Sequence, residues 1–454
     1  MADKPSRKTF HLRLDEMVNR LKEDILTSKL QTGDYLPSEK SLGEQFHLSN
    51  RSVRKGLEVL VREGLIVKVP KVGNRVTRPD DGGTLTVRFG YYKSMAYEAD
   101  LHHLLTLFQE QYPQIRVQAV PIAGDVGIKE YLEAGLLDAA TVNYPTYQSI
   151  LDGKERDWLE EQPPDPSMYP YVTHAFTADG LLMAKPFLFS PLVLCYNREH
   201  IRANGLLEPD SGWSWQDLSQ VASQLTRPNE RLGFYFHLQS RNRWPVFLLQ
   251  SGGSLRKEPD GRPIICGTDW MEGFKVCRDL IVNQRTMPMF DQESDAEELF
   301  RQGKASMIMT SYFAMNRLRS MKGDWDIAPL PHLRNGKTLL LVIGLIVNRN
   351  SSRKEAARKL IDFLTSYPAQ LAVRKNTLSI PALKPAAEWT GPDSHYRPQR
   401  FHLYREVAPT FSFYDELGLS NDDIVRMTQQ AKMYWSGLCD EQQLCESLER
   451  CLSG

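Results

Sequence analysis

The first eighty positions carry apolar residues at helical spacing, followed by a short alternating segment. From Leu14 to Leu26 the apolar residues recur three and four positions apart, which predicts an amphipathic helix. Ser38 and Ser49 each precede a further run of this kind, and a serine there can accept a hydrogen bond from the first helical turn. Residues 65–69 and 75–76 then alternate around a polar turn. This pattern predicts three helices and a β-hairpin.

Beyond residue 84 the pattern changes to strands that alternate with helices. Residues 85–91 and 115–119 predict strands, and a stripe formed by Leu101, Leu104 and Phe108 predicts the helix between them. Strand, helix, strand is the order typical of a parallel sheet with covered faces. The preceding segment is polar and contains proline and glycine, which favours a linker. We therefore expect a small N-terminal domain at 1–78, a linker at 79–84 and an α/β domain at 85–454.

Composition and charge narrow the picture. The chain of 454 residues is 41% hydrophobic with a formal net charge of zero, which is typical of a soluble globular protein. Residues 1–80 hold 16 basic and 11 acidic residues, so this domain has a net charge of +5 and is suited to an acidic partner. The most apolar stretch, Leu339–Val347, is too short to span a bilayer. We expect a cytoplasmic protein without a membrane partner.

The six cysteines show no paired motif and no dense framework, which favours a reducing compartment. Three of them, Cys439, Cys445 and Cys451, recur every six residues near the C-terminus. We expect neither a disulfide nor a metal there. Enzyme motifs are also scarce, because Pro331 stands where a phosphate-binding loop before Gly336 would need its first glycine. We therefore expect no enzyme activity, no cofactor and no metal.

The segments LPSEKSLGEQF, LSNRSVRKGLEVLVREGLI and VGNRV together resemble the GntR family of bacterial transcription regulators. The resemblance covers residues 10–77 and implies a winged helix-turn-helix that binds operator DNA. Ser41, Gly56 and Lys71 depart from the usual family pattern. A protein-binding winged helix with a solvated basic face is the alternative. The positions that carry over as DNA contacts are Lys40, Ser49, Asn50, Arg51, Ser52, Arg54, Lys71 and Gly73.

Four later segments resemble the sugar-binding group of extracellular solute-binding proteins. They are LLTLFQEQYPQIRVQAV, MAKPFLFSPLVLCYNREHIRANGL, LFRQGKASMIMTSYF and KEAARKLIDFLTS, in that order. The resemblance implies a two-lobed domain of the type II periplasmic-binding-protein fold, with ligand bound between the lobes. Lobe one is expected at about 85–190 and 306–348, and lobe two at about 191–305 and 349–454.

Candidate ligand contacts follow the predicted strands. In α/β sheets, ligands bind beside loops at the carboxyl ends of strands, and here these loops combine aromatic rings with amides and hydroxyls. A saccharide offers a ring face for stacking and hydroxyls for hydrogen bonds, so this mixture suits a sugar. Core packing is the alternative for each single aromatic. The candidates are Tyr92, Lys93, Asn143, Tyr144, Thr146, Tyr147, Phe189, Ser190, Arg241, Trp244, Ser311, Tyr312 and Phe313.

These observations predict a regulator that binds operator DNA as a homodimer and senses a small molecule, expected to be a sugar. We expect Tyr144, Trp244 and Phe313 to contribute most to ligand binding. One alternative is a regulator of the MocR type with an aminotransferase domain that binds pyridoxal phosphate, although no lysine lies in the small-residue setting that a Schiff base needs. Another is the effector domain of LacI-like regulators, which has a different strand order.

Overall fold

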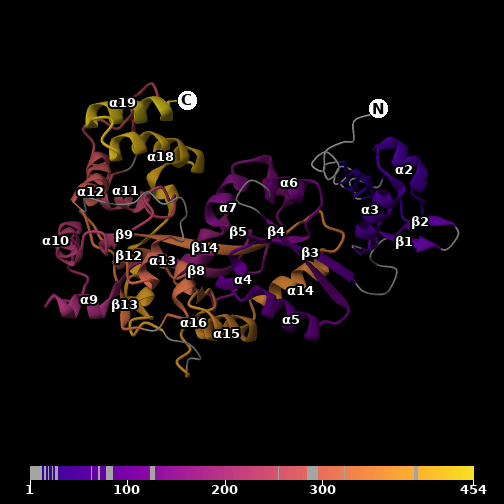
Figure 1. The fold of residues 1–454 in the computed structure, drawn as a ribbon, viewed down its shortest axis with the longest axis horizontal. Helices are drawn as coiled ribbons and strands as arrows, with labels where there is room; N and C mark the ends of the chain where they lie inside the picture. Colours follow the sequence, from indigo (N-terminus) through magenta and orange to yellow (C-terminus); the bar gives the residue numbers. More distant parts are fainter. Residues whose placement is uncertain are drawn as a thin grey trace.

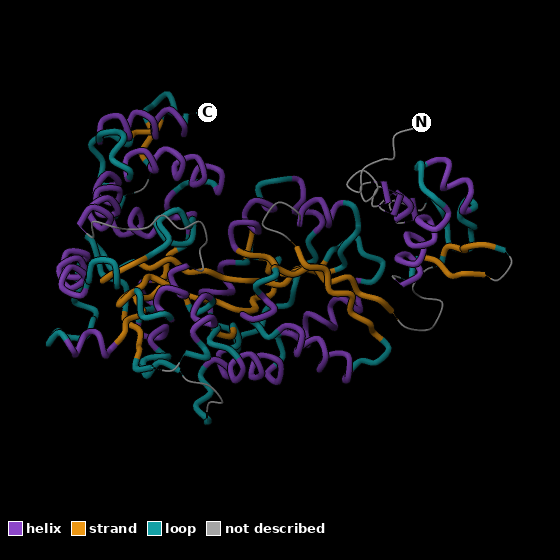
Figure 2. The backbone as a smooth tube through the Cα atoms, viewed as in Figure 1, coloured by secondary structure: helices purple, strands orange, loops and turns teal. Residues whose placement is uncertain are grey.

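The computed structural model describes residues 13–453 apart from residues 15–16, 19, 23, 26–28, 63, 70–71, 78–84, 123–127, 254, 284–294, 322 and 393–396. The chain forms a small N-terminal domain and a larger α/β body built on one ten-stranded sheet (Figure 1, Figure 2). Lys71 and the expected linker at 79–84 lie outside the described residues.

The N-terminal domain has the expected helices and hairpin. Residues 13–14, 17–18, 20–22 and 24–25 are helical, and after them come α2 (Glu39–Gln45), α3 (Asn50–Arg62), β1 (Ile66–Val69) and β2 (Gly73–Val76). The Ser38 side chain accepts from the Ser41 backbone N–H at 3.1 Å and so caps α2, as expected. β1 and β2 pair antiparallel. A core that includes Met17, Leu42 and Leu57 holds the helices together, which makes the domain a winged helix-turn-helix.

Gly56 lies where the first helix comes close to α3. A methyl group on Gly56 would approach Met17 Cε to 2.3 Å and Leu14 Cδ1 to 3.1 Å. An alanine there would require these flexible side-chain ends to shift. Glycine costs about 1 kcal/mol inside a helix, and at position 56 it leaves room for the side chains of the first helix.

The α/β body is built on a continuous sheet. Its strand order is β4 (Ile115–Ile122), β3 (Leu85–Tyr92), β5 (Ala139–Asn143), β14 (Thr338–Val347), β8 (Lys185–Asn197), β12 (Ala305–Ser311) and β9 (Leu232–Tyr235). β3 pairs parallel with β4 and β5, whereas β14 pairs antiparallel with β5 and β8. The returning strand beside three parallel strands is the order of the type II fold and not of the LacI-like alternative. β8 is fully buried and runs through both halves of the sheet.

Lobe one is the half of the body around β3, β4 and β5 (Figure 1). Val87 and Phe89 of β3 share a buried cluster with Leu104 of one helix and Leu360 of another. The structure therefore puts residues 354–376 on lobe one, although the sequence analysis assigned 349–454 to lobe two. The helices of this half are α4 (Met95–Glu98), α5 (Leu101–Gln111), α6 (Ile128–Glu133), α7 (Tyr144–Leu151), α14 (Lys354–Leu364) and α15 (Tyr367–Asn376).

Lobe two is the half of the body that contains residues 192–197 of β8 together with β12 and β9. β12 and β13 (Trp325–Ala328) both pair with residues 192–197 of β8, although residues 306–348 were expected in lobe one. The reason is that the chain crosses between the halves more often than the boundaries assumed. The helices of lobe two are α9 (Arg198–Ala203), α10 (Trp215–Leu225), α11 (Pro245–Ser251), α12 (Trp270–Asn283), α13 (Asp295–Arg301), α18 (Asn421–Trp435) and α19 (Glu441–Leu452).

Short elements connect and extend these halves. Two-residue strands pair as β6 (Thr177–Ala178) with β7 (Leu181–Leu182), and as β10 (Arg256–Lys257) with β11 (Pro263–Ile264). β15 (Ile380–Pro381) pairs with β8, and β16 (Phe411–Ser412) pairs with β14. The remaining helical turns are α8 (Pro170–Ala175), α16 (Lys384–Ala387), α17 (Leu403–Glu406), η1 (Lys154–Trp158), η2 (Ala314–Leu318), η3 (Ala408–Thr410) and η4 (Tyr414–Leu417).

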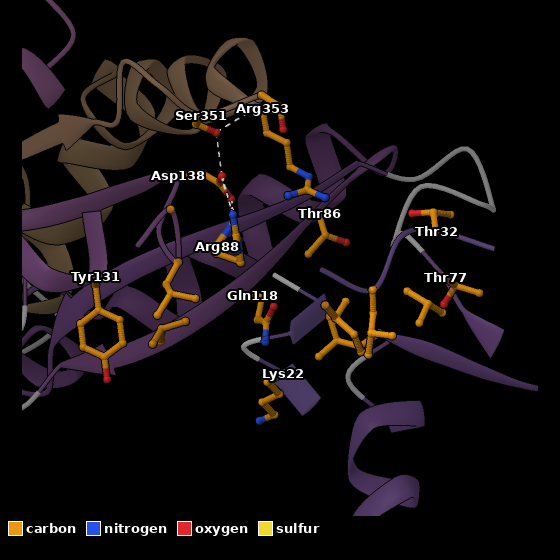
Figure 3. Close-up of a pocket in the computed structure, with 18 of the residues that line it drawn as sticks. Lys22, Thr32, Thr77, Thr86, Arg88, Gln118, Tyr131, Asp138, Ser351 and Arg353 are labelled. Atoms are coloured by element: carbon orange, nitrogen blue, oxygen red, sulfur yellow. Dashed lines mark hydrogen bonds and ion pairs between the residues drawn. The ribbon is translucent and has the colours of Figure 1, made fainter. Parts of the chain in front are cut away.

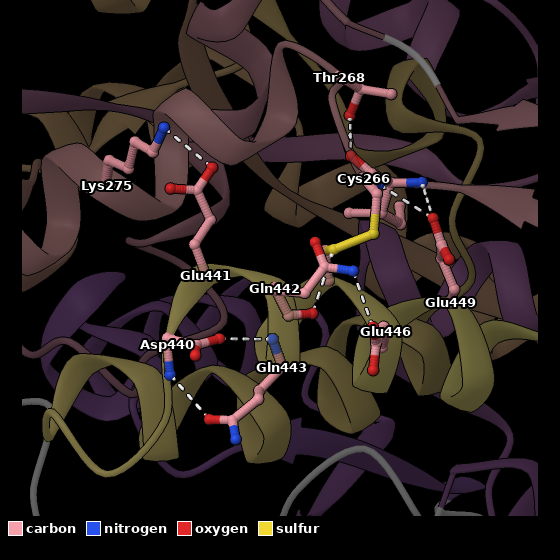
Figure 4. Close-up of a disulfide and its surroundings, with 11 residues drawn as sticks. Cys266, Thr268, Lys275, Asp440, Glu441, Gln442, Gln443, Glu446 and Glu449 are labelled. Carbon is pink, nitrogen blue, oxygen red and sulfur yellow. Dashed lines mark hydrogen bonds and ion pairs between the residues drawn. A yellow bond between two sulfur atoms is a disulfide. The ribbon is translucent and has the colours of Figure 1, made fainter.

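A disulfide fixes the C-terminal helix to lobe two (Figure 4). Cys266, which follows β11, is bonded to Cys445 of α19, and their Cα atoms are 5.2 Å apart. The Glu449 carboxylate also accepts from the backbone N–H groups of Ile265 and Cys266 at 2.8 and 2.9 Å. The expectation of no disulfide was wrong for Cys445, because its partner lies 179 residues away and sequence spacing does not reveal it.

Candidate functional site

The exposed start of α3 forms the candidate DNA-binding surface. Asn50, Arg51 and Arg54 are exposed, and Lys40 is exposed on the neighbouring α2. Gly73 is exposed where β2 begins, and its φ of +146° lies in the region that favours glycine. Helix N-termini present backbone N–H groups and a positive dipole end, which attract phosphate. The structure thus gathers donors and cations at the end of the domain expected to meet DNA.

Ser49 and Ser52 are hydrogen-bonded to each other at the start of the same helix. The Ser49 hydroxyl lies 2.7 Å from that of Ser52 and accepts from the Ser52 backbone N–H at 3.3 Å. Ser52 is buried, with 6% of its surface exposed. The cap explains both serines without DNA, so base contact by Ser52 is the least favoured of the expected DNA contacts.

Arg54 is held in place by a carboxylate. Its Nε lies 2.7 Å from Glu39 Oε2 on α2, while 64% of the arginine side chain remains exposed. An exposed ion pair of this kind contributes about 0–1 kcal/mol. The pair orients the guanidinium. Because breaking the pair costs little free energy, Arg54 can still reach a DNA base.

Three candidate ligand residues come together at the ends of β3 and β5. The Asn143 backbone N–H donates to the Tyr92 hydroxyl at 3.3 Å, and that hydroxyl donates to Thr146 Oγ1 at 3.4 Å. Asn143 Oδ1 accepts from the Thr146 backbone N–H at 2.8 Å and caps α7. Tyr92 and Asn143 are half-buried. The expected convergence of polar groups at this sheet edge is therefore present.

Tyr144 lies beside this group and reaches a segment from the far end of the chain. Its ring centroid is 4.7 Å from that of Phe413, at an interplanar angle of 39°. Burial, and then the charge of Asp415 together with a hydrogen bond to it, raises the pKa of the Tyr144 hydroxyl. Phe413 is half-buried and Asp415 is exposed. We refer to Tyr92, Asn143, Tyr144, Phe413 and Asp415 as the boundary cluster.

Phe189 belongs to a second aromatic group. Its ring packs edge-on against Tyr169, Tyr171 and Tyr404, at centroid distances of 5.4, 5.4 and 5.7 Å. Tyr171 also packs edge-on against Phe411, at 5.1 Å, and both rings are half-buried. Phe189 itself is fully buried. The ring faces available to a ligand in this group are therefore those of Tyr171 and Phe411, rather than that of Phe189.

Three other aromatic candidates are core residues in this structure. Trp244 is 1% exposed, donates through its indole N–H to Thr428 Oγ1 at 3.0 Å and packs against Phe274 and Trp435. Tyr147 and Tyr312 are fully buried, and their hydroxyls donate to the backbone carbonyls of Phe176 and Phe401 at 2.9 and 2.8 Å. All three side chains are buried and their polar atoms are hydrogen-bonded, which is what core packing, the alternative to ligand binding for each aromatic, implies.

The remaining candidates are dispersed. Ser190 Oγ accepts from the Phe313 backbone N–H at 3.2 Å, and both residues are buried. Ser311 is also buried, and its hydroxyl accepts from the Ala314 backbone N–H at 3.3 Å. Arg241, which is half-buried, donates to Asn421 Oδ1 at 2.9 Å in lobe two, and Lys93 is exposed after β3. Of these, Arg241 and Lys93 retain surface for a ligand.

Four residues near the candidate site were not predicted from the sequence: Tyr171, Phe411, Phe413 and Asp415. The last three lie in the run FSFYDEL, whose repeated aromatics beside acidic residues were the available signal. Phe411 lies in β16, which has only two residues and pairs with β14 from more than seventy positions away, and Phe413 and Asp415 follow it. Neither a strand pattern nor its partner can be read from so short a segment.

Comparisons with protein families match both parts of the chain. Residues 14–76 match bacterial regulatory proteins of the gntR family, and residues 82–371 match bacterial extracellular solute-binding proteins. Neither is an enzyme family, and the aminotransferase alternative gains no support. Among the described residues, no helix is both long enough and apolar enough to cross a membrane.

Individual relatives divide in the same way. A putative binding protein of Brucella abortus is 24% identical over 221 residues, which are 46% of this chain and 53% of that protein. The transcriptional repressor NagR of Bacillus subtilis is 38% identical over 64 residues, which are 14% of this chain and 26% of that protein. The chain thus spans about half the length of the curated binding proteins that it matches, and about a quarter of NagR.

Solved structures resemble the α/β body. Maltose-bound MalE3 of T. maritima superimposes with a TM-score of 0.70 at 20% identity, over 82% of this chain and 99% of that one. An ABC substrate-binding protein of Listeria monocytogenes in complex with cycloalternan gives a TM-score of 0.68 at 20% identity, over 82% and 98%. At this level of identity the likeness shows the two-lobed fold alone.

Proposed function

Because the chain belongs to the bacterial extracellular solute-binding protein family and carries a gntR-family domain at its N-terminus, we propose that it is a ligand-responsive transcription regulator. The N-terminal winged helix binds operator DNA, and the two-lobed body binds a small molecule. The observation that carries the proposal is the presence of both domains in one chain, each with an exposed set of suitable side chains. No reaction is assigned to the protein.

Arg51 and Arg54 are proposed to read bases in the major groove. Both are exposed on the first turns of α3, the position from which a recognition helix contacts base edges. Lys40 on α2 and Lys71 in the wing contact phosphate in this proposal. Ser49 and Asn50 add hydrogen bonds at the helix start, and Gly73 lets the wing backbone approach the duplex. A single winged helix buries little surface, so we propose that a homodimer binds a near-palindromic site.

The ligand is proposed to be a saccharide at the boundary cluster. Phe413 offers a half-buried ring face, and Tyr144, which is only 5% exposed, packs against it. Asp415 and Asn143 offer acceptors for sugar hydroxyls. The similar solved structures include proteins bound to maltose and to cycloalternan, which supports this ligand class. Tyr92, Lys93, Thr146, Tyr171 and Arg241 complete the proposed site.

Closure of the lobes is the proposed switch. Tyr144 belongs to α7 of lobe one, and Phe413 lies in the C-terminal segment that continues through η4 to α18 of lobe two. A ligand that contacts both binds the closed arrangement more tightly than the open one, and only this difference can shift the equilibrium. Coupling of about 1–3 kcal/mol, or about 5- to 150-fold in operator affinity, is typical of such switches.

The DNA part is tested by gel-shift titration of a defined operator. One bidentate contact between arginine and guanine contributes about 1–3 kcal/mol, so Arg51→Ala or Arg54→Ala should weaken binding by about 5- to 150-fold. Arg256→Ala, which changes an exposed arginine on β10 of lobe two, is the matched control. Unchanged affinity in both α3 variants would show that α3 does not read the operator.

The sensing part is tested by operator affinity with and without a saccharide that a thermal-shift screen identifies. A ligand at about 100 times its dissociation constant adds roughly 2.7 kcal/mol to stability, which such a screen detects. We expect saturating ligand to change operator affinity about 5- to 150-fold. Tight ligand binding that leaves operator affinity, DNA bending and transcription unchanged would show that the body is not an allosteric sensor.

A further inference from the structure

A cavity of about 940 Å³ lies between the winged helix and lobe one (Figure 3). Lys22, Thr32 and Thr77 line it from the N-terminal domain, and Thr86, Arg88 and Arg353 line it from lobe one. Its volume is within the range of about 300–1,000 Å³ that is usual for small-molecule sites. The boundary cluster does not contribute to its walls. This cavity is therefore separate from the proposed saccharide site.

The wall from lobe one is an unusually polar sheet face. Val87 and Phe89 of β3 are buried on one face, whereas Thr86 and Arg88 alternate with them and are half-buried on the other. Gln118 of β4 lies opposite Arg88 in the register and is exposed. Sheets of this type normally have both faces covered by helices and are apolar on both sides. The polar face is the face that lines the cavity.

The carboxylate of Asp138 is fully engaged beneath this face. It accepts from the Arg88 backbone N–H at 2.7 Å, from the Arg88 guanidinium at 3.1 and 3.2 Å and from the Ser351 hydroxyl at 2.7 Å. Asp138 is only 1% exposed. Its charge is thus balanced locally by Arg88. The hydrogen bond from Ser351 to Asp138 holds the loop that carries Ser351 and Arg353 against the sheet.

The lining has a positive formal charge. Among the described residues that line the cavity, Lys22, Arg88 and Arg353 are cationic and Asp138 is the only acid, which gives +2. Hydroxyl and amide groups, including those of Thr86 and Gln118, provide further hydrogen-bonding atoms. Cations with neutral donors around a cavity are the chemistry that holds an oxyanion, and a phosphate monoester carries about −1.5 to −2 at neutral pH.

We propose that this cavity is a second effector site that binds a small phosphate monoester. The phosphate lies between Lys22 of the winged helix and Arg353 of lobe one, and the hydroxyls of the ligand meet the threonine and glutamine side chains. A ligand held by both domains stabilises one arrangement of the winged helix on lobe one. Its effect on operator binding rests on the proposed function, but its binding does not.

The first test measures binding directly, without DNA. Isothermal titration of the full-length protein uses glucose 6-phosphate and inorganic phosphate as probes, with potassium chloride at matched ionic strength as the salt control. We expect both probes to bind with saturation and glucose 6-phosphate to bind more tightly. Arg353→Gln and Lys22→Gln should each weaken binding about 10-fold, the loss typical for one charge-assisted hydrogen bond. Arg349→Gln, an exposed neighbour outside the lining, should leave affinity unchanged.

Cross-controls separate the two sites. Phe413→Ala changes the boundary cluster and should leave phosphate affinity unchanged. Absence of saturable binding by both probes, or equal affinity in wild type, Arg353→Gln and Lys22→Gln, would refute the second site. Loss of glucose 6-phosphate binding in Phe413→Ala with no loss in the two cation variants would place the probe at the boundary cluster and refute it as well. If phosphate binds as expected but operator affinity never responds to any ligand, the regulator proposal fails and the second site remains.

Discussion

Tyr144 and Trp244 occupy equivalent places in the sequence but different places in the structure. Each precedes a proline at the start of a helix, α7 for Tyr144 and α11 for Trp244. Tyr144 contacts Phe413 and Asp415, whereas Trp244 contacts Phe274, Trp435 and Thr428. The difference comes from what covers each ring. α18 of lobe two closes over Trp244, and the boundary between the lobes leaves polar groups beside Tyr144.

The comparison shows why an aromatic residue after a strand is an incomplete signal for a ligand site. The local sequence sets the start of the helix and the direction of the ring. Both rings are buried, so the difference lies in what packs against them. For Trp244 this is a segment far along the chain, since Thr428 and Trp435 both lie on α18. Tyr367 also precedes a proline at the start of a helix, α15, although it follows a helix and not a strand, and 44% of its surface is exposed.

The largest expected effect is on stability. Trp244→Ala should lower the free energy of unfolding by about 3–5 kcal/mol, the usual cost of removing a large buried aromatic. Tyr367→Ala, with the same aromatic-proline context on an exposed surface, should change it by less than about 0.5 kcal/mol. Urea unfolding of the two variants measures this contrast.

Trp244 was expected from the sequence to contribute strongly to ligand binding, and in that case Trp244→Ala would abolish the effect of ligand on DNA while leaving apo DNA affinity intact. A variant that keeps the wild-type unfolding free energy but loses its ligand response would support that prediction and contradict the placement of Trp244 in the core. Loss of stability with retained saccharide affinity would support the core placement.

The second prediction concerns the disulfide that supports α18, the helix that packs over Trp244. α18 packs on α12 and α19, and the disulfide between Cys266 and Cys445 fixes α19 to lobe two. Cys266→Ser should lower the free energy of unfolding by about 2–4 kcal/mol, and a reducing agent should have a similar effect on the wild type. Cys439→Ser, which changes a free cysteine, is the control. Equal stability of the reduced and oxidised wild type would show that the crosslink does not support this cover.

How far the sequence predicted the fold depends on the range of the interactions. The winged helix was predicted closely, because its helices have strong stripes and the Ser38 cap is local. In the body, the alternation of strands and helices predicted an α/β sheet, and the resemblance to solute-binding proteins implied the type II fold. The lobe boundaries were less accurate, because residues 354–376 carry a helical pattern that does not say which half of the sheet they cover.

The candidate site was predicted in part for the same reason. Tyr92, Asn143 and Thr146 follow β3 and β5, and adjacent strand ends bring such residues together. Phe413 and Cys445 depend on partners far along the chain, Tyr144 and Cys266. No local pattern predicts which distant residue closes such a pair.

The third prediction tests the boundary side of the comparison. Phe413→Ala should weaken saccharide binding about 10-fold, because one aromatic contact contributes about 0.5–1.5 kcal/mol beyond the area that it buries. Asp415→Asn should also weaken binding by removing a charged acceptor, with little change in unfolding free energy because Asp415 is exposed. Isothermal titration with the saccharide found by screening measures both. Unchanged affinity in both variants would place the saccharide elsewhere.

The smallest effect is a pH dependence in the lobe that contains Trp244. Burial, and then the charges of Arg231 and Arg227, lowers the pKa of His200 from 6.5 to about 4, and its Nδ1 lies 3.1 Å from Ser306 Oγ. Between these two values the unfolded chain binds a proton that the folded protein does not, so stability falls as the pH decreases below about 6.5. The ring is partly exposed, which reduces the effect to less than about 1 kcal/mol. His200→Gln removes this titration, and the difference between its unfolding free energy and that of the wild type should change between pH 7 and pH 4 and stay constant above pH 7. A difference that is constant over the whole range would show that His200 is not held neutral by the fold.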